Sequence, residues 1–153
     1  MIMRTVAALA LVGVSSHAWV GQAWAAQHDS TAMAMYAAAI RKIESTNRYH
    51  ITANAGRGRT ALGAYQILDT NLASWSRAAL GRPVSQAEFL QSPSLQDQVF
   101  HHRFGHYVRK YGPHGAARAW LGGEGAARGG GGVDRFGSTP SSYAAKFMRE
   151  ASR

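Results

Sequence analysis

The chain has 153 residues, which is enough for one domain with a substantial core and too few for two. It contains no cysteine, and this excludes disulfides, zinc–thiolate sites and a cysteine nucleophile. Its formal net charge of +9 predicts attraction to polyanions, such as nucleic acid, cell-wall glycan, lipopolysaccharide or teichoic acids.

The N-terminus has the layout of a secretory signal peptide. A positively charged start (MIMR) precedes an apolar run (TVAALALVGV), and Ala23-Trp24-Ala25 forms a small-x-small cleavage site. We expect residues 1–25 to be the signal and residues 26–153 to form one exported domain, either periplasmic or secreted. An uncleaved membrane anchor is the alternative, but polar residues from Ser15 onward interrupt the apolar run, so we expect no stable membrane insertion. Export favours wall polyanions over nucleic acid as partners.

The first half of the domain predicts a helix, a loop and a second helix. Asp29 or Ser30 can cap a helix that runs to about Ser45 with apolar residues every three or four positions. Residues 46–62 predict an irregular loop, or a small hairpin, and GAYQIL (63–68) a short extended segment. A helix capped by residues 69–71 then continues through Leu80, where Gly81 and Pro83 close it.

The second half predicts more helices and no alternation of strands with helices. Ser85–Glu88 is a capping-box pattern, and Ser92-Pro93 opens the longest helix, which ends at Gly112-Pro113. A short helix from about Gly115 to Leu121 precedes a glycine-dense stretch, and Thr139-Pro140 opens the last helix. The predicted class is mainly α, with a small β-hairpin at most.

Glu44 is the acidic residue whose position best suits chemistry. It follows Ile40 by four residues and Ala37 by seven, so it lies on the apolar face of its helix, close to the C-terminal end. Burial and the helix dipole both favour the protonated form of a carboxyl group there. A carboxylic acid that stays protonated near neutral pH can protonate a leaving group. The alternative is a surface ion pair with Arg41 or Lys42.

Three segments around this glutamate resemble a known family when taken in order. They are Glu44-Ser45, then GAYQI (63–67), then AWLGG (119–123), and FLQSPSLQDQVF (89–100) between them looks like the helix opening of phage-type relatives. Together they resemble the soluble-type lytic transglycosylases, which have a lysozyme-like α fold. The resemblance covers about residues 32–147; each motif is weak alone, and the ordered set is fairly specific.

The resemblance implies that Glu44 is the sole catalytic acid and base. Enzymes of this family cut the β-1,4 bond between N-acetylmuramic acid and N-acetylglucosamine in peptidoglycan without consuming water. The glutamate protonates the glycosidic oxygen and then takes the proton of the muramoyl C6 hydroxyl, which closes a 1,6-anhydro ring. A conventional glycosidase needs two carboxyl groups, whereas an internal nucleophile can replace the second one.

Four further residues are implied to bind substrate. Ser45 matches the family serine that contacts substrate or steadies the helix end. Gln66 matches a glutamine near the scissile bond, and Tyr65 lines the sugar cleft or packs in the core. Trp120 departs from the family pattern, because Trp120-Leu121 stands where Tyr-Asn is usual. Its indole stacks on a sugar, fills core, or donates to Glu44 from a different position than a tyrosine would.

Two alternatives to a transglycosylase remain open. A hydrolytic muramidase would use Glu124, Asp134 or Asp69 as a second carboxylate. A scaffold of a secretion apparatus would bind peptidoglycan and lack activity. In each case we expect a monomer that binds glycan strands, with an envelope-spanning secretion complex as a further partner, and no nucleic acid. We expect no cofactor and no metal, since the pair His102 and His106 lacks an evident third ligand.

Overall fold

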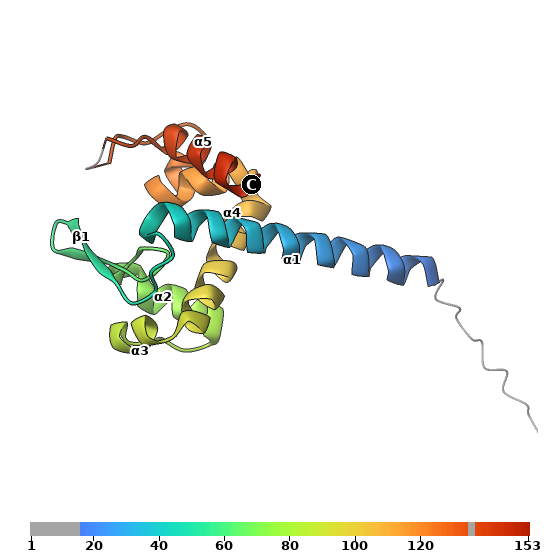
Figure 1. The fold of residues 1–153 in the computed structure, drawn as a ribbon, viewed down its shortest axis with the longest axis horizontal. Helices are drawn as coiled ribbons and strands as arrows, with labels where there is room; N and C mark the ends of the chain where they lie inside the picture. Colours follow the sequence, from blue (N-terminus) through green and yellow to red (C-terminus); the bar gives the residue numbers. More distant parts are fainter. Residues whose placement is uncertain (1–15, 135–136) are drawn as a thin grey trace, which may run out of the picture. The chain divides into compact units, whose positions relative to one another are not determined.

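The structure is a computed structural model that describes residues 16–134 and 137–153, with side chains from Asp29 onward. It divides into two units, Met1–Thr31 and Ala32–Arg153, and the site described below lies entirely in the second. Figure 1 shows the elements, which in chain order are α1 (Ser16–Ser45), β1 (Thr52–Gly56), β2 (Arg59–Leu62), β3 (Ile67–Leu68), α2 (Asp69–Leu80), α3 (Gln86–Gln91), α4 (Pro93–Gly122), the 3-10 helix η1 (Glu124–Ala126) and α5 (Pro140–Ala151).

The end of α1 agrees with the sequence and its beginning does not. The helix ends at Ser45 as predicted, and its face carrying Ala37 and Ile40 is buried. The prediction that Asp29 or Ser30 caps the start is wrong, because both lie inside α1. No proline precedes them between Ser16 and His28, so no residue there forces the helix to break. The predicted signal peptide lies largely outside the described residues, since residues 1–15 are not described.

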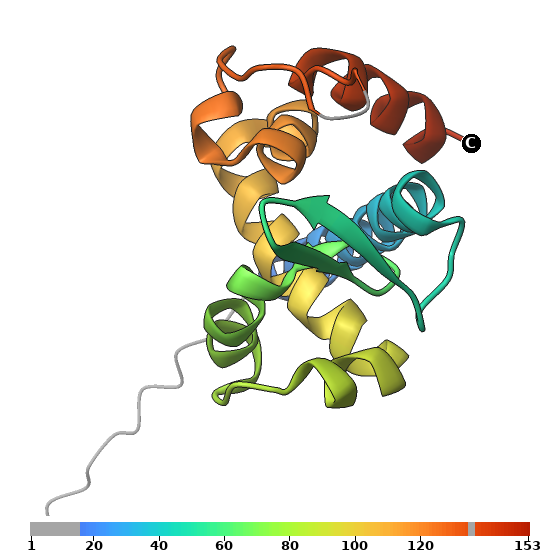
Figure 2. The same ribbon diagram turned by 90° about the vertical axis from the view of Figure 1, so that its left-hand side faces the viewer.

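The loop predicted after α1 contains a small antiparallel sheet. Its strand order is β1-β2-β3, with Thr52 opposite Leu62 and Leu62 opposite Ile67. The hairpin alternative is therefore confirmed, and β3 adds a strand that the sequence did not predict separately. Figures 1 and 2 both show the sheet below α5 and above α3.

The segment GAYQIL is extended only at its end. Gly63 to Gln66 form a turn, in which the Gln66 backbone N–H donates to the Gly63 carbonyl at 3.2 Å. Glycine is required at position 63, since its φ is +69° and a Cβ atom there would lie 2.1 Å from Oε1 of Gln96. Gln96 is fully buried in α4, and its Oε1 accepts a hydrogen bond from the Ala64 N–H at 2.8 Å. The turn is thus fixed against the long helix.

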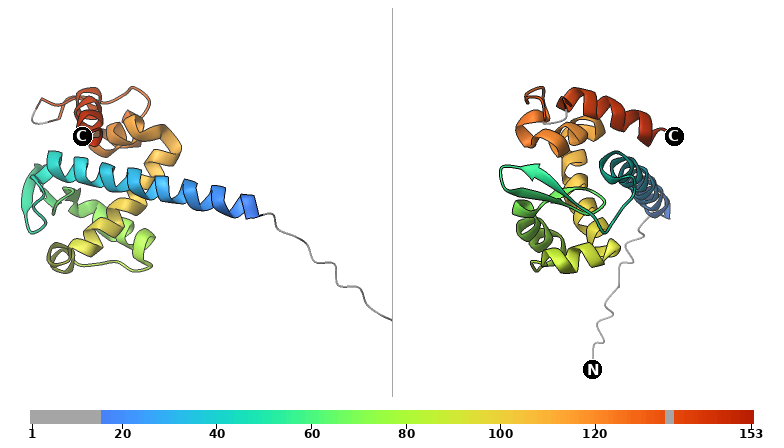
Figure 3. Two further views of the ribbon diagram at one scale, coloured as in Figure 1. Left: turned by 45° about the vertical axis from the view of Figure 1, so that its right-hand side comes forward. Right: turned by 60° about the vertical axis from the view of Figure 1, so that its left-hand side comes forward.

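The helix boundaries in the second half follow the predicted caps. Ser85, Ser92 and Thr139 each accept a hydrogen bond from a backbone N–H in the first turn of α3, α4 and α5 respectively. Gly81, in the left-handed conformation, ends α2. At Gly112 the backbone leaves the helical conformation (φ 70°, ψ 169°), so α4 consists of two helical parts that meet at the predicted Gly-Pro break. Figure 3 shows these parts running in different directions.

The core of the second unit is aromatic and is built around α4. Tyr65 stacks on Phe100 with ring centroids 4.2 Å apart, and Phe100 in turn stacks on Phe104 at 4.9 Å. Phe147 of α5 lies 5.6 Å from Phe104, and Tyr36 of α1 contacts both rings. Helix α4 also packs against α2, α3 and η1. This core joins the end of α1, the turn before β3 and helix α5, all three of which contribute to the site.

The prediction of a mainly α-helical fold with a small β-hairpin is confirmed. Among the described residues, no helix combines the length and the apolar character that crossing a membrane would require.

Candidate active site

Glu44 lies in the last turn of α1, where it is half-buried. Its Oε1 accepts a hydrogen bond from the hydroxyl of Tyr143, a buried residue of α5. The two neighbouring cations of α1 are engaged elsewhere. Lys42 pairs with Glu150 at 2.6 Å, and Arg41 lies 3.6 Å from Asp97. A surface ion pair of Glu44 with either of them is therefore not formed.

The surroundings of Glu44 keep its carboxyl group protonated to an unusually high pH. Burial raises its pKa from 4.5 to about 7. The negative charge of Asp134 acts in the same direction, whereas the Tyr143 hydrogen bond and the positive charge of Lys146 act against it. Near neutral pH the group therefore exchanges readily between an acid that can donate a proton and a carboxylate that can accept one.

Glu44 opens onto a cleft of about 710 Å³. Its walls come from the end of α1, the hairpin β1–β2, Gln66 and Leu68 at either side of Ile67, the end of α4 and the loop at residues 133–134. Figure 2 shows the backbone of these segments. Its lining residues are Glu44, Ala53, Asn54, Ala55, Gly56, Arg57, Arg59, Ala61, Gln66, Leu68, Trp120, Leu121, Val133 and Asp134. Three residues that the sequence singled out, Glu44, Gln66 and Trp120, thus meet in one cleft.

Gln66 is held in the cleft by its own turn. Its Nε2 donates to the Gly63 carbonyl at 2.9 Å, which leaves the Oε1 side of the carboxamide for a donor in the cleft. Its φ is +53°, a conformation that costs energy for a residue other than glycine. A strained residue with an anchored polar side chain in the same cleft as Glu44 is well placed to hydrogen-bond a ligand.

Trp120 contributes to both the core and the cleft. One side of its indole packs edge-on against Phe100 and Phe104, with centroids 5.2 and 5.8 Å away, and Trp75 lies 5.5 Å away. The ring remains half-exposed and lines the cleft. The alternatives of core packing and sugar stacking are therefore compatible. The hydroxyl that holds Glu44 comes from Tyr143 and not from the Trp120 segment.

Ser45 and Tyr65 do not line the cleft. The Ser45 hydroxyl donates to the Arg41 carbonyl at 3.2 Å and accepts from the Arg48 N–H at 3.0 Å, so it closes the end of α1. Of its two implied roles, the structure favours steadying the helix end. Tyr65 is fully buried, and the structure favours the core-packing alternative over a place in the cleft.

Tyr65 belongs to a polar cluster beneath the site. Its hydroxyl accepts from Arg41 at 2.8 Å and donates to Asp97 at 2.6 Å, and Tyr49 donates to the same Asp97 oxygen at 2.9 Å. Arg41 also lies over the rings of Tyr49 and Tyr65. The cluster links α1, one turn before Glu44, to the residue that precedes Gln66. It therefore fixes the spacing between these two residues of the cleft.

The three candidates for a second carboxylate have different surroundings. Asp134 lines the same cleft as Glu44, and its Oδ1 accepts the Ser138 N–H at 2.7 Å. Glu124 lines a neighbouring cavity, where Lys110 and Tyr111 lower its pKa to about 2. Asp69 accepts the N–H of the next residue at the start of α2 and does not line the cleft. Only Asp134 shares a cavity with Glu44.

Tyr143, which lies 99 residues after Glu44 in the chain, was not predicted from the sequence to be part of the site. A signal was present, because Tyr143 and Phe147 are four residues apart on the buried face of α5. A tyrosine hydroxyl on a buried face needs a polar partner, and Glu44 on another buried face needs one as well.

Within the part of the chain whose side chains are described, no three His, Cys, Asp or Glu residues group as metal ligands would. Comparison with known proteins found no matching family model, no matching curated protein and no matching solved structure.

Proposed function

We propose that this protein is a peptidoglycan lytic transglycosylase with a lysozyme-like fold. The observation that carries the proposal is the environment of Glu44, whose carboxyl group has a pKa of about 7 and opens onto a cleft that also contains Gln66 and Trp120. A cleft that combines an aromatic ring with several hydrogen-bonding side chains suits a glycan strand. The order of the motifs in the sequence, which resembles that family, supports the same assignment.

In the proposed reaction Glu44 acts twice. As a carboxylic acid it protonates the oxygen that links N-acetylmuramic acid to N-acetylglucosamine, so the bond breaks and the second sugar leaves as an alcohol. The resulting carboxylate then takes the proton of the muramoyl C6 hydroxyl, whose oxygen bonds to C1 and forms the 1,6-anhydro ring. Glu44 ends protonated, and no water is consumed. A pKa near 7 suits both steps, because neither protonation state is strongly favoured.

The other cleft residues have supporting roles in this proposal. Tyr143 holds the Glu44 carboxyl group in one orientation, and Gln66 accepts a hydrogen bond from the sugar next to the scissile bond. Trp120 provides an apolar surface for a sugar ring. We further propose that the protein is exported to the periplasm or secreted, where its positive charge attracts it to the anionic wall.

A hydrolytic muramidase is the second candidate, and Asp134 favours it. Because Asp134 lines the cleft with Glu44, it is the residue that could activate water or stabilise a cationic sugar. The two reactions give different products. Sacculi digested by a transglycosylase release 1,6-anhydro-muropeptides, whereas a muramidase produces reducing ends.

Mass spectrometry of digested sacculi tests the proposal, with wild-type protein and Glu44→Gln compared at equal concentration. We expect anhydro products from the wild type and at least a hundredfold slower release from the variant, the usual scale of general acid catalysis. Reducing ends in place of anhydro ends would favour the muramidase. Wild-type protein that binds sacculi without releasing either product would instead favour the non-catalytic scaffold.

A further inference from the structure

A second cavity lies next to the Glu44 cleft and shares part of its wall. It has a volume of about 470 Å³ and is lined by residues of β2, β3, α2, α4 and η1. The residues that line both cavities are Arg59, Leu68, Trp120 and Leu121. The two cavities therefore adjoin at these four residues, and we call the second one the branch cavity.

Two arginines of the hairpin lie where the two cavities adjoin, a place we call the junction. Arg57 lines the Glu44 cleft and Arg59 lines both cavities. Among the described residues, neither guanidinium has a carboxylate within ion-pair distance. The Arg59 Nε makes one long hydrogen bond, of 3.4 Å, to the Gly56 carbonyl. Arg59 is half-buried, so its charge faces a partly enclosed space.

The other arginine of the branch cavity, Arg103, is already engaged. Arg103 donates to the hydroxyl of Tyr107 at 2.9 Å and to Glu124 at 3.3 Å, and its guanidinium lies 5.0 Å from the centre of the Trp75 ring. Its charge is thus balanced by Glu124. The positive charge available to a ligand at the junction comes from Arg59, with Arg57 beside it at the turn of the hairpin.

We propose that the branch cavity binds the acidic peptide stem of peptidoglycan, with Arg59 as the anchor for a stem carboxylate. This inference rests on the proposed function and specifies which form of the substrate the site takes. A peptidoglycan strand is neutral along its sugars, and its negative charges are the carboxylates of the peptides that branch from the muramic acids. A guanidinium at the mouth of a side cavity pairs with such a carboxylate through two parallel hydrogen bonds.

The branch cavity also has the apolar and polar groups that a short peptide needs. Trp75 and Trp120 offer ring surfaces, and the start of α2 contributes Thr70 and Asn71 as hydrogen-bonding side chains. Thr70, Asn71 and Trp75 line only the branch cavity, whereas Trp120 lines both spaces. The sugar backbone can therefore occupy the Glu44 cleft while a stem occupies the branch cavity.

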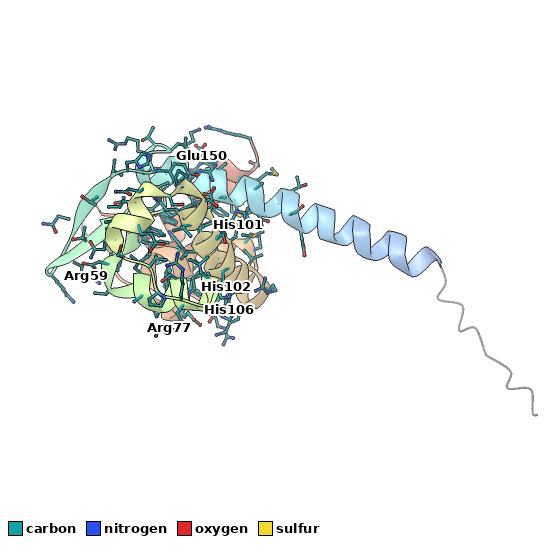
Figure 4. All side chains as sticks on the ribbon, turned by 90° about the horizontal axis from the view of Figure 1, so that it is seen from below. Arg59, Arg77, His101, His102, His106 and Glu150 are labelled. Carbon is teal, nitrogen blue, oxygen red and sulfur yellow. The ribbon has the colours of Figure 1, made fainter. Side chains whose placement is uncertain are left out.

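The test compares Arg59→Gln with Arg77→Gln as a matched control. Arg77 is an exposed arginine of α2 that lines neither cavity, and Figure 4 labels both it and Arg59. Each variant is assayed on stem-bearing glycan strands and on strands whose stems an amidase has removed. We expect Arg59→Gln to lower the ratio of kcat/KM on stem-bearing strands to that on stripped strands at least tenfold, because it loses a pair of charge-assisted hydrogen bonds. Arg77→Gln should leave this ratio unchanged.

A binding measurement keeps this inference separate from the catalytic proposal. Calorimetry with the free stem tetrapeptide, as the acid and with its carboxylates amidated, needs no turnover. We expect wild type and Arg77→Gln to bind the acid form, and Arg59→Gln or the amidated peptide to give at least tenfold weaker binding. Equal binding of acid and amide, or an unchanged substrate ratio in Arg59→Gln, overturns the inference. If the wild type cleaves no glycan but binds the acid peptide through Arg59, the transglycosylase proposal fails and the peptide site stands.

Discussion

Replacing Glu44 by Gln should stabilise the protein at alkaline pH and have little effect at acid pH. In the unfolded chain the carboxyl group has its ordinary pKa of 4.5, whereas in the folded protein the pKa is about 7. Between these values the folded protein holds a proton that the unfolded chain has released, so the free energy of unfolding falls as the pH rises. Over this interval the loss amounts to about 3 kcal/mol, at 1.36 kcal/mol for each pH unit. The glutamine side chain has the shape of glutamate and can still accept the hydrogen bond from the Tyr143 hydroxyl, but it has no charge to bury.

Urea denaturation of wild type and Glu44→Gln at pH 4, 6 and 8 measures this difference. We expect the variant to match the wild type at pH 4 and to exceed it by about 3 kcal/mol at pH 8, which is about 10 °C in Tm for a domain of this size. Glu88→Gln is the control, because the Glu88 side chain is 39% exposed and its pKa is lowered by Arg82. Its removal should therefore not produce a gain in stability that grows with pH. A difference between wild type and Glu44→Gln that is the same at all three pH values would refute the reasoning.

The contacts of Tyr143, Gln96 and Phe147 can each be tested by removing the side chain that makes them. Tyr143→Phe removes a hydrogen bond that lowers the pKa of Glu44, so the alkaline limb of the pH–rate profile should move upward by about one pH unit; an unmoved limb would mean that the hydroxyl has only a packing role. Gln96→Leu leaves the Ala64 N–H and two backbone carbonyls without their partner, and chemical denaturation should show a loss of at least about 3 kcal/mol. Phe147→Ala should cost about 3 to 5 kcal/mol in the same assay, and a cost below 1 kcal/mol would contradict its place in the core.

The helix ends could be predicted from the sequence because their signals are local. A cap at Ser92 or Thr139 depends on residues within one turn, and the break at Gly112 follows from two adjacent residues. The start of α1 was predicted wrongly because a local cap signal permits a helix to begin but does not require it. Ser30 can cap a helix but does not oblige one to begin, and no helix breaker precedes it.

The sheet could be predicted only in part. A hairpin was one of the two structures predicted for the loop after α1. Strand β3 could not be predicted, because it forms only when Ile67 pairs with Leu62 on the other side of a turn. That turn depends on Gln96, which approaches Gly63 from α4. Such long-range contacts have no counterpart in local patterns, so the segment was predicted to be uniformly extended.

The site residue Glu44 could be predicted because its position on one helix face is a local property. Its partner Tyr143 could not, because their contact joins two elements that are distant in the sequence. The position of Glu44 relative to Ile40 was enough to predict an inward-facing carboxyl group, and burial is indeed the main cause of its raised pKa. Its partner Tyr143 comes from α5, and no spacing within α1 could reveal it. Tyr65 was ambiguous from the sequence, because an aromatic residue beside Gln66 can face either the cleft or the core.

Titration of Glu44 itself tests the central claim most directly. The carboxyl ¹³C resonance of Glu44, identified by its absence in Glu44→Gln, can be followed from pH 3 to pH 9 in the protein without ligand. We expect the titration of this resonance to have its midpoint near pH 7. A midpoint near 4.5, that of an ordinary exposed glutamate, would contradict it, because the residue would then be ionised at neutral pH and could not supply the first proton.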